Sequence, residues 1–431
     1  MLSQIVRNFN LVQKGSFLKK YIAQSTFCKQ KLKLSSFCDI MEKAIDEREE
    51  NLNVKKEERH KANKERYDGR VKRRVWENKP ESEEAKKQRI EEFGEERIKR
   101  RKCVILLGYS GVNYSGMQRN PDTSTIEEEL MKAMLKVKWI NEMAFETPQQ
   151  VQFQRAARTD KGVSACRQVV SIKIPEKVDI DEINDILPSD IRVFAVKRVT
   201  KGFNSKSNCD ARTYSYTLPT YAFAKKDEVY DEKSFRLSSE RLEELNKILN
   251  LYEGTKNYHN FTIRKEPSDP SCRRYIIKVE CKQPYIPDGT EVEFSKIIIK
   301  GQSFMMHQIR RMVGLVIAIM KGFAEPYLIA HAMQKEKFNV PQAPGLGLVL
   351  EKVHYERYNK KYAEDGVHES LEFKDEDAVA EEFYMRNIMS TIIETELKER
   401  SMQSWIKGLL HHSFSAEAAE NNEEDGGNTS D

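Results

Sequence analysis

The chain has 431 residues, of which 39% are hydrophobic and 33% are charged, and its formal net charge is +5. This length predicts two or three domains, and the high charged content predicts long solvated segments. No apolar run approaches the ~20 residues that a membrane-spanning helix needs, so we predict no membrane partner. The seven cysteines include no Cys-x-x-Cys pair, which argues against a disulfide framework or a zinc site and favours a reducing compartment.

Residues 1–38 are basic and contain no Asp or Glu. A basic, acid-free start with serines among apolar residues is typical of a mitochondrial targeting segment, and an ordinary basic tail is the alternative. Met41 follows where the chain becomes acidic. A second start there would remove the segment and give two isoforms.

Residues 39–102 consist mainly of Lys, Arg and Glu without aliphatic periodicity. Interspersed charges of both signs predict a disordered segment or a solvated helix. Two basic clusters, residues 72–74 and 99–102, suit nuclear import or contact with RNA phosphates.

The folded core is predicted to begin at Cys103, and residues 104–108 have the pattern of a buried strand. The Gly- and Ser-rich residues 109–120 predict a loop whose aromatics and Arg119 suit stacking and phosphate contact. Ser124 and Glu127 have the spacing of a capping box, so a helix is expected to run to about Lys138. Residues 141–150 are interpreted as a connector.

Residues 155–165 read Arg-Ala-Ala-Arg-Thr-Asp-Lys-Gly-Val-Ser-Ala and lie between strand-like runs at 151–154 and 168–174. Asp160 and Gly162 are the predicted turn residues. One interpretation is a solvated hairpin tip that happens to be charged. The other is a functional loop, because neighbouring cations should hold Asp160 ionised, which suits a nucleophile better than a general acid.

The following residues predict alternating helices and strands. We expect helices at 179–187 and 238–251 and strands at 191–199, 212–218, 273–279 and 292–300. The strand at 212–218 places Tyr214 and Tyr216 on one face, where Tyr is most often core packing.

A helix is predicted at 304–321, with an apolar stripe through Met306, Ile309, Val313 and Ile317. Arg310 lies within this stripe, and a half-buried Arg needs an anion. A structural salt bridge is the alternative. We assign no chemical role to His307. The turn-rich residues 341–347 then lead into a final strand.

These separated motifs resemble the tRNA pseudouridine synthase A (TruA) family over about residues 103–358, and most closely its eukaryotic nuclear and mitochondrial branch. In that family the loop Asp is the nucleophile, an Arg on a helix reaches it, and a strand Tyr and a loop apolar residue flank the target uracil. The resemblance therefore implies Asp160, Arg310 and Tyr214 as catalytic residues and Leu346 as a substrate contact. The residues expected to bind substrate phosphates are Arg119, Arg155, Arg158 and Lys161.

The implied fold is α+β, with two ferredoxin-like halves, 103–220 and 221–360, around a basic central cleft. A helical extension at 361–414 and a disordered acidic tail at 415–431 complete the expected layout.

The implied activity is isomerisation of uridine to pseudouridine in tRNA, notably near the anticodon stem, and in other RNAs such as mRNA and small nuclear RNA. The final C5 proton is expected to pass to Tyr214 or to a water. This reaction requires no metal, nucleotide or other cofactor. We expect a monomer in the mitochondrion and the nucleus.

Two other functions are open. One is a catalytically silent RNA-binding or chaperone protein on the same fold, against which the presence of Asp160, Tyr214 and Arg310 counts. The other is an RNA N-glycosidase. A glycosidase normally uses two carboxylates, whereas the basic loop contains one acid, which favours isomerisation.

Overall fold

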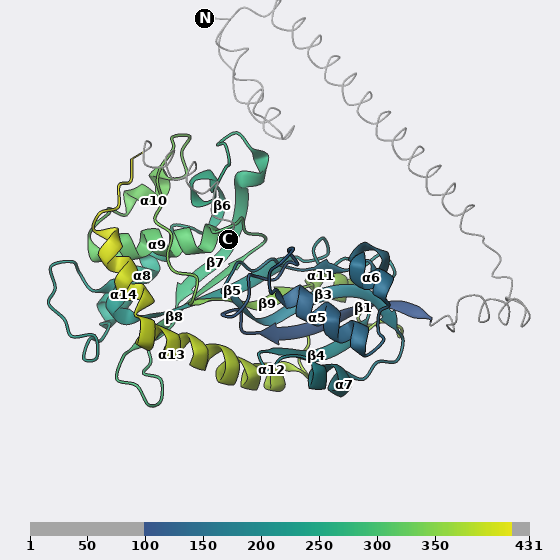
Figure 1. Cartoon of the computed structure of the whole chain (residues 1–431). Helices are drawn as coiled ribbons and strands as arrows, with labels where there is room; N and C mark the ends of the chain where they lie inside the picture. The colour runs from purple at the N-terminus through teal and green to yellow at the C-terminus, as the bar shows by residue number, and fades with distance from the viewer. Residues whose placement is uncertain (1–98, 416–431) are drawn as a thin grey trace, which may run out of the picture. The chain divides into compact units, whose positions relative to one another are not determined.

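The computed structural model describes residues 99–415 (Figure 1). The predictions for residues 1–38, for residues 39–98 and for the tail after Ser415 therefore lie outside the described residues. Among the described residues, no helix is long and apolar enough to cross a membrane.

The described part is built on one large mixed sheet, which confirms the α+β class (Figure 1). Its strands are ordered β4-β1-β3-β9-β5-β8-β7-β6, and the short β2 pairs with β3. The strand bounds are β1 Arg100–Tyr109, β2 Gln154–Arg155, β3 Ser164–Pro175, β4 Ile191–Arg198, β5 Ala211–Pro219, β6 Gly254–Asn257, β7 Arg273–Cys281, β8 Phe294–Gly301 and β9 Leu348–His354.

Strand β9 joins the two parts of the sheet: the first part is β4-β1-β3, and the second part is β5-β8-β7-β6. It pairs in parallel with β3 through Ser164↔Val349 and Ala165↔Leu350, and antiparallel with β5 on its other side. Strand β5 falls in the range expected for the first half, yet its partners β8 and β9 both fall in the second. The halves therefore share a continuous backbone hydrogen-bond network.

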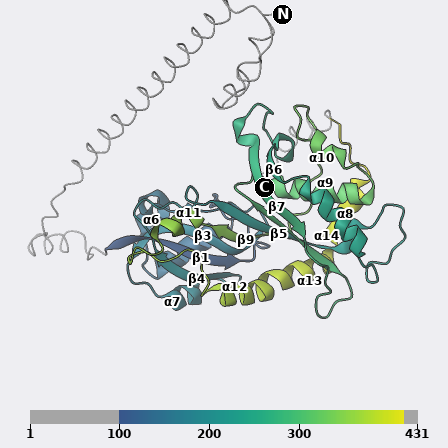
Figure 2. The ribbon, with the colours of Figure 1, turned by 180° about the vertical axis from the view of Figure 1, so that it is seen from behind.

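Helices cover the sheet. Figures 1 and 2 show α12 and α13 running along the sheet from the end that carries α7 to the end that carries α14. The α-helix bounds are α5 Ile126–Lys136, α6 Glu142–Glu146, α7 Ile180–Ile186, α8 Ser239–Asn250, α9 Gln308–Lys321, α10 Tyr327–His331, α11 Glu356–Tyr362, α12 Asp377–Phe383, α13 Ser390–Glu399 and α14 Ser401–Leu409. Short 3₁₀ turns are η2 Pro148–Val151, η3 Thr220–Phe223, η4 His259–Phe261 and η5 Pro270–Cys272, and η6 Tyr384–Met389 is a π-helical turn.

Helix α12, the π-turn η6 and α13 follow one another without a break, and we call residues 377–399 the rod. At about 1.5 Å per residue a helix of this length spans about 35 Å. At its first end Arg167 Nε lies 2.9 Å from Asp377 Oδ1, and Phe383 packs edge-on against Phe194. Further along, Lys296 of β8 lies 4.5 Å above the Tyr384 ring. The rod thus braces strands from both parts of the sheet.

The structure confirms several predicted elements and corrects others. Helices α7 and α8 match the helices predicted at 179–187 and 238–251, and Asp179 and Ser238 are their N-caps. The cap of α5 is Thr125, not Ser124, because the Thr125 hydroxyl accepts from Glu128 N. The predicted connector 141–150 contains α6 and most of η2.

The predicted helix at 304–321 begins only at Gln308, so the first part of that prediction was wrong. His307 has a φ of +60°, in the left-handed region, which stops the helix from extending backwards. Met306 consequently lies outside the helix and is exposed, although it was predicted to belong to the apolar stripe.

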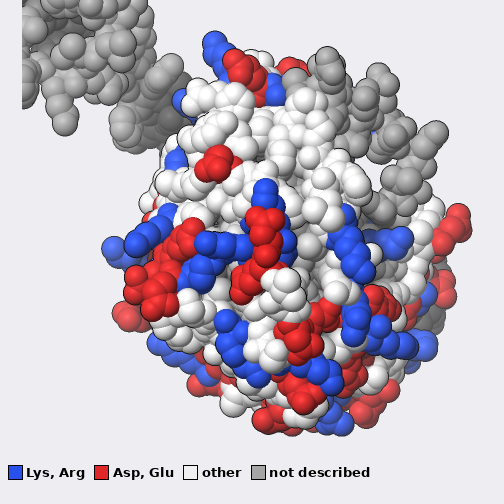
Figure 3. Space-filling model, turned by 90° about the vertical axis from the view of Figure 1, so that its left-hand side faces the viewer, with Lys and Arg blue, Asp and Glu red and all other residues white. Residues whose placement is uncertain are grey.

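Charge is mixed over the end of the described part that carries α8 and α14. Figure 3 shows Lys and Arg side chains interspersed with Asp and Glu there. Such a surface offers no extended field of one sign to a polyanion.

A substitution at Gly314 of α9 tests how closely this helix packs on the segment before β9. A Cβ at Gly314 would lie 2.2 Å from Pro341 O. We expect Gly314→Ala to lower the free energy of unfolding by about 2 kcal/mol or more, because backbone must shift. Urea denaturation measures this change.

Gly408→Ala, at an exposed position of α14, is the matched control, because a Cβ there would meet nothing within 4 Å. It should raise stability by up to about 1 kcal/mol, as Ala favours helix over Gly. Equal effects of the two substitutions would contradict the close approach at Gly314.

Candidate active site

Residues 155–165, which we call the Asp160 loop, connect β2 to β3. Val163 N donates to Asp160 O at 3.1 Å, and Gly162 has a φ of +76°, so Asp160 and Gly162 are turn residues as predicted. The Asp160 side chain is 31% exposed. The carboxylate is therefore accessible on a defined turn.

The loop at 109–120 holds the Asp160 loop in place. The Tyr109 hydroxyl lies 2.8 Å from Thr159 Oγ1, in a buried contact. Met117 N donates to Thr159 O at 3.1 Å, and Gly162 N donates to Tyr114 O at 3.2 Å. Thr159 and Gly162 flank the Asp160–Lys161 dipeptide, so these bonds fix the backbone on both sides of the carboxylate.

Gly116 makes this contact between the two loops sterically feasible. It has a φ of +92°, and a Cβ at this position would lie 2.8 Å from Thr159 O. Any side chain would therefore push against the backbone next to Asp160, and the left-handed conformation favours Gly as well.

Arg212 connects the Asp160 loop to the second part of the sheet. Its Nε and Nη2 donate to Ala156 O at 3.1 and 2.7 Å, and its Nη1 donates to Gln302 O at 3.0 Å. Gln302 directly precedes the segment that leads to α9. A single guanidinium thus fixes the spacing of two segments that are far apart in sequence.

His307 approaches Asp160 from the second part of the sheet, with its Nε2 3.8 Å from Asp160 Oδ2. Gln342 is placed in the amide orientation that satisfies both of its neighbours. Its nitrogen then donates to His307 Nδ1 at 3.1 Å, and its oxygen accepts from both Nη atoms of Arg310 at 3.1 Å. Because Nδ1 accepts, the ring proton of a neutral His307 lies on Nε2 and faces the carboxylate.

Arg310 lies one helical turn after His307. Its Nε donates to Ala343 O at 2.8 Å. Arg310 is thus connected to Asp160 through Gln342 and His307. The direct contact between Arg310 and Asp160 that the family resemblance implies stays a prediction.

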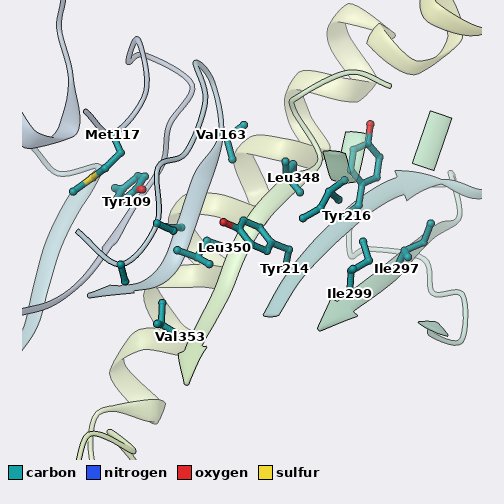
Figure 4. Close-up of a cluster of buried hydrophobic side chains, with 14 of the residues drawn as sticks. Tyr109, Met117, Val163, Tyr214, Tyr216, Ile297, Ile299, Leu348, Leu350 and Val353 are labelled. Carbon is teal, nitrogen blue, oxygen red and sulfur yellow. The ribbon is translucent and has the colours of Figure 1, made fainter. Parts of the chain in front are cut away.

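Tyr214 lies beside this cluster on β5. In Figure 4 its hydroxyl points to the side of the cluster where Tyr109 and Val163 lie, whereas the hydroxyl of Tyr216 points away from that side. Burial raises the pKa of Tyr214 well above its usual range, and the charges of Tyr109 and Asp160 raise it further, against the lowering effect of Arg212. Tyr216 donates its hydroxyl to Pro344 O at 2.7 Å and thereby positions the loop before β9.

Leu346 is half-buried and packs against an apolar cluster formed by β3, β9 and the rod. The buried members of this cluster include Val349, Tyr384 and Met389. The predicted contact between Leu346 and a substrate base stays a prediction.

The four predicted phosphate-binding residues fall into two groups. Arg119 pairs with Glu128, and Arg155 Nη2 lies 2.7 Å from Glu127 Oε2, so both guanidinium groups already have acidic partners on α5. Arg158 and Lys161 are exposed on either side of Asp160. The second pair is therefore better placed to meet a phosphate, and the role of all four stays a prediction.

The sequence interpretation missed two residues of this site. His307 was given no role, although it is the His nearest the carboxylate in the described contacts. Arg212 was regarded only as part of a strand motif. The one signal for Arg212 in the sequence was its position two residues before Tyr214, which places both side chains on the same face of the strand.

Arg212→Lys tests whether Arg212 immobilises the Asp160 loop. One ammonium cannot donate to Ala156 O and Gln302 O with the geometry of the guanidinium. We expect the amides of residues 156–163 to exchange hydrogen about ten-fold faster, measured by mass spectrometry of the peptide 155–165, since a lost charge-assisted bond costs about 1.5 kcal/mol.

Arg236→Lys is the control, because Arg236 donates only to carbonyls of its own turn in the described contacts. It should leave exchange in the peptide 155–165 unchanged. Unaltered exchange in Arg212→Lys would show that the other contacts suffice to hold the loop.

Comparison with known proteins identifies relatives over most of the chain. A model of the tRNA pseudouridine synthase family matches residues 248–356. The chain is 48% identical over 348 residues to "Pseudouridylate synthase 1 homolog" of Mus musculus, covering 80% of this chain and 82% of that protein. It is 51% identical over 319 residues to the protein of the same name from Homo sapiens, with coverages of 73% and 74%.

A third relative, "tRNA pseudouridine synthase 1" of Yarrowia lipolytica, is 34% identical over 361 residues and covers 64% of this chain and 68% of its own. All three relatives come from eukaryotes, which confirms the predicted branch. The identity extends over about four fifths of both chains in the mouse comparison. This chain therefore belongs to the TruA-type tRNA pseudouridine synthase family.

Proposed function

We propose that this protein is an isomerase that converts uridine to pseudouridine in tRNA, with Asp160 as the nucleophile. The observation that carries this proposal is the position of Asp160 on an immobilised loop at the junction of the two parts of the sheet. Its carboxylate lies 3.8 Å from His307 of the opposite part. The relatives named for tRNA pseudouridylation support the substrate.

The reaction rearranges bonds without net oxidation or reduction. Attack by the Asp160 carboxylate forms a bond to C1′ as the uracil N1–C1′ bond breaks. The uracil turns within the site, and the C5–C1′ bond then forms as the bond from C1′ to Asp160 breaks. The proton on C5 then leaves and N1 gains one, so atoms and charge balance. His307 and the exposed cations Arg158 and Lys161 are placed to keep the carboxylate ionised and directed at the substrate.

The target uridine must leave its stack to reach this site. Enzymes that act on a base inside a helix flip the nucleotide into a pocket and stack the base against apolar or aromatic side chains. We propose that Tyr214 and Leu346 contact the two faces of the uracil. Tyr216 and Arg310 donate hydrogen bonds to carbonyls of the loop before β9, which carries Leu346. These bonds position the loop and support the proposed contact.

The finer parts of the proposal concern layout, targets and location. We propose that the two parts of the sheet are ferredoxin-like halves that enclose a basic cleft, and that the protein acts as a monomer. We further propose that mRNA and small nuclear RNA are substrates, and that the protein works in the mitochondrion and the nucleus. The acid-free residues 1–38 support mitochondrial targeting. Pseudouridine maps of mitochondrial and nuclear RNA, with and without active protein, test the last two points.

Asp160→Ala and Asp160→Asn test the nucleophile. We expect tritium release from tRNA labelled at uridine C5 to fall by at least about three orders of magnitude, because loss of a nucleophile removes the covalent step. Affinity for tRNA should stay within about three-fold, since cations supply most of the binding energy.

Asp288→Asn, on an exposed loop, is the control and should release tritium at the normal rate. Unchanged release by Asp160→Ala would refute the nucleophile. Free uracil and abasic RNA in place of pseudouridine would identify an N-glycosidase, and binding without any product in the normal protein would identify a silent RNA-binding protein.

Tyr214→Phe tests whether the phenol transfers the C5 proton. Burial raises the pKa of Tyr214 above its usual value of 10, so the hydroxyl stays protonated below that pH. The phenol can then accept the C5 proton only by passing on its own proton in the same step. Removing the hydroxyl should lower kcat by about a hundred-fold, a usual contribution of proton transfer, and should leave the shape of the pH–rate profile between pH 6 and 9 unaltered.

Tyr216→Phe, on the same strand, is the control and should lower kcat by less than about ten-fold, as it loses one neutral hydrogen bond. A limb of the profile between pH 6 and 9 that vanishes in Tyr214→Phe would contradict the raised pKa. A normal kcat in Tyr214→Phe would assign the proton transfer to water.

A further inference from the structure

A strongly basic pocket of about 1030 Å³ lies at the first end of β1, away from Asp160. The Asp160 loop contacts the other end of this strand through Tyr109. The ten residues of β1 span about 30 Å at about 3.3 Å per residue. The pocket is therefore distinct from the site described above. Its basic lining residues are Lys99, Arg100, Arg101, Lys102, Lys173, Arg198 and Lys201.

The described lining of this pocket contains no Asp or Glu. Near it, Glu176 lies 3.5 Å from Arg101 and 3.7 Å from Arg198, and Asp365 pairs with the lining residue His368. The other five cations have no acidic partner among residues 99–415. The groove of about 1020 Å³ beside the Asp160 loop is different, because its four cations are matched by five acids, Asp122, Glu127, Glu128, Glu129 and Glu146.

Two cations of the pocket face each other across neighbouring strands. Lys102 of β1 is paired in register with Lys173 of β3. Like charges directly opposite each other in a sheet are destabilising. Lys102 is nevertheless buried, with 5% of its surface exposed, and its Nζ donates to Gln152 O at 2.7 Å.

The surroundings of Lys102 disfavour its charged form. Burial and then the positive charge of Lys173 lower the pKa of Lys102 to about 8. A bound anion would relieve both the repulsion and this shift. The fold thus keeps together a cluster of cations that repel one another, and a bound anion would remove this repulsion.

We propose that this pocket binds backbone phosphates of the substrate RNA at a point about 30 Å from the reacting uridine. This inference rests on the proposed function for the identity of the RNA. An RNA that is long enough occupies both sites, whereas a short stem–loop occupies only the site at Asp160. The pocket therefore contributes to affinity for full-length tRNA and not to the chemistry.

The test reverses two exposed charges, Lys99→Glu and Lys201→Glu together, in the full chain. We expect the Kd for full-length tRNA to rise by about ten-fold or more at low salt, and its log–log salt slope to become shallower by about 1 to 2, since two phosphate contacts are lost. The Kd for a target stem–loop too short to span the distance should not change. In turnover the loss should appear in KM for tRNA.

The matched control is Lys226→Glu with Lys247→Glu, two exposed lysines of the second part of the sheet. It should change the tRNA Kd by less than about two-fold, beyond general charge effects. An equal loss in test and control, or an equal loss for tRNA and stem–loop, would overturn the proposal. The proposal would also be overturned if the charge-reversed protein bound tRNA normally but unfolded at a lower temperature. That result would show that the pocket binds an acidic segment of the same chain.

The binding measurements do not depend on catalysis. If the protein bound tRNA but formed no pseudouridine, the proposed function would fail while the pocket could still pass this test. If pseudouridine formed normally and the charge reversal had no effect on tRNA, only the pocket would fail.

Discussion

The structure depends on the insertion of β9 between β3 and β5. Only two residue pairs join β9 to β3, so this junction is short for a contact that unites two parts of a sheet. The rod compensates by crossing the sheet and by pairing with strands on both sides. Asp160 lies four residues before β3, and the loop with Gln342 and Leu346 directly precedes β9. The same pairing therefore unites the sheet and brings the two parts of the candidate site together.

The carboxylate is positioned by backbone contacts more than by its own neighbours in sequence. Thr159 and Gly162 are bound by the loop at 109–120, and Ala156 is bound by Arg212. These bonds leave little freedom to the turn that carries Asp160. On the proposed function, a nucleophile held in this way does not have to be ordered when substrate binds, which removes an entropic cost from the reaction.

Local features of the sequence predicted much of this molecule. Helices α7 and α8 and the turn at Asp160 were found because a few adjacent residues determine them. The start of α9 was misplaced because His307 adopts the left-handed conformation, and periodicity carries no information about it. The pairing of β9 with β3, the ion pair of Arg155 with Glu127 and the bridge made by Arg212 join residues that are far apart in sequence. Propensity and spacing could therefore not reveal them.

The continuous sheet also determines whether the protein or the RNA has to change conformation. Its two parts share backbone hydrogen bonds through β9 and are braced by the rod, so they cannot separate as hinged lobes do. On the proposed function, the conformational work then falls on the RNA, which must expose a uridine to a preformed site. Uridines in loops, bulges and stem ends unstack at least cost. Selection among uridines would follow from the mechanical softness of the RNA as much as from its base sequence.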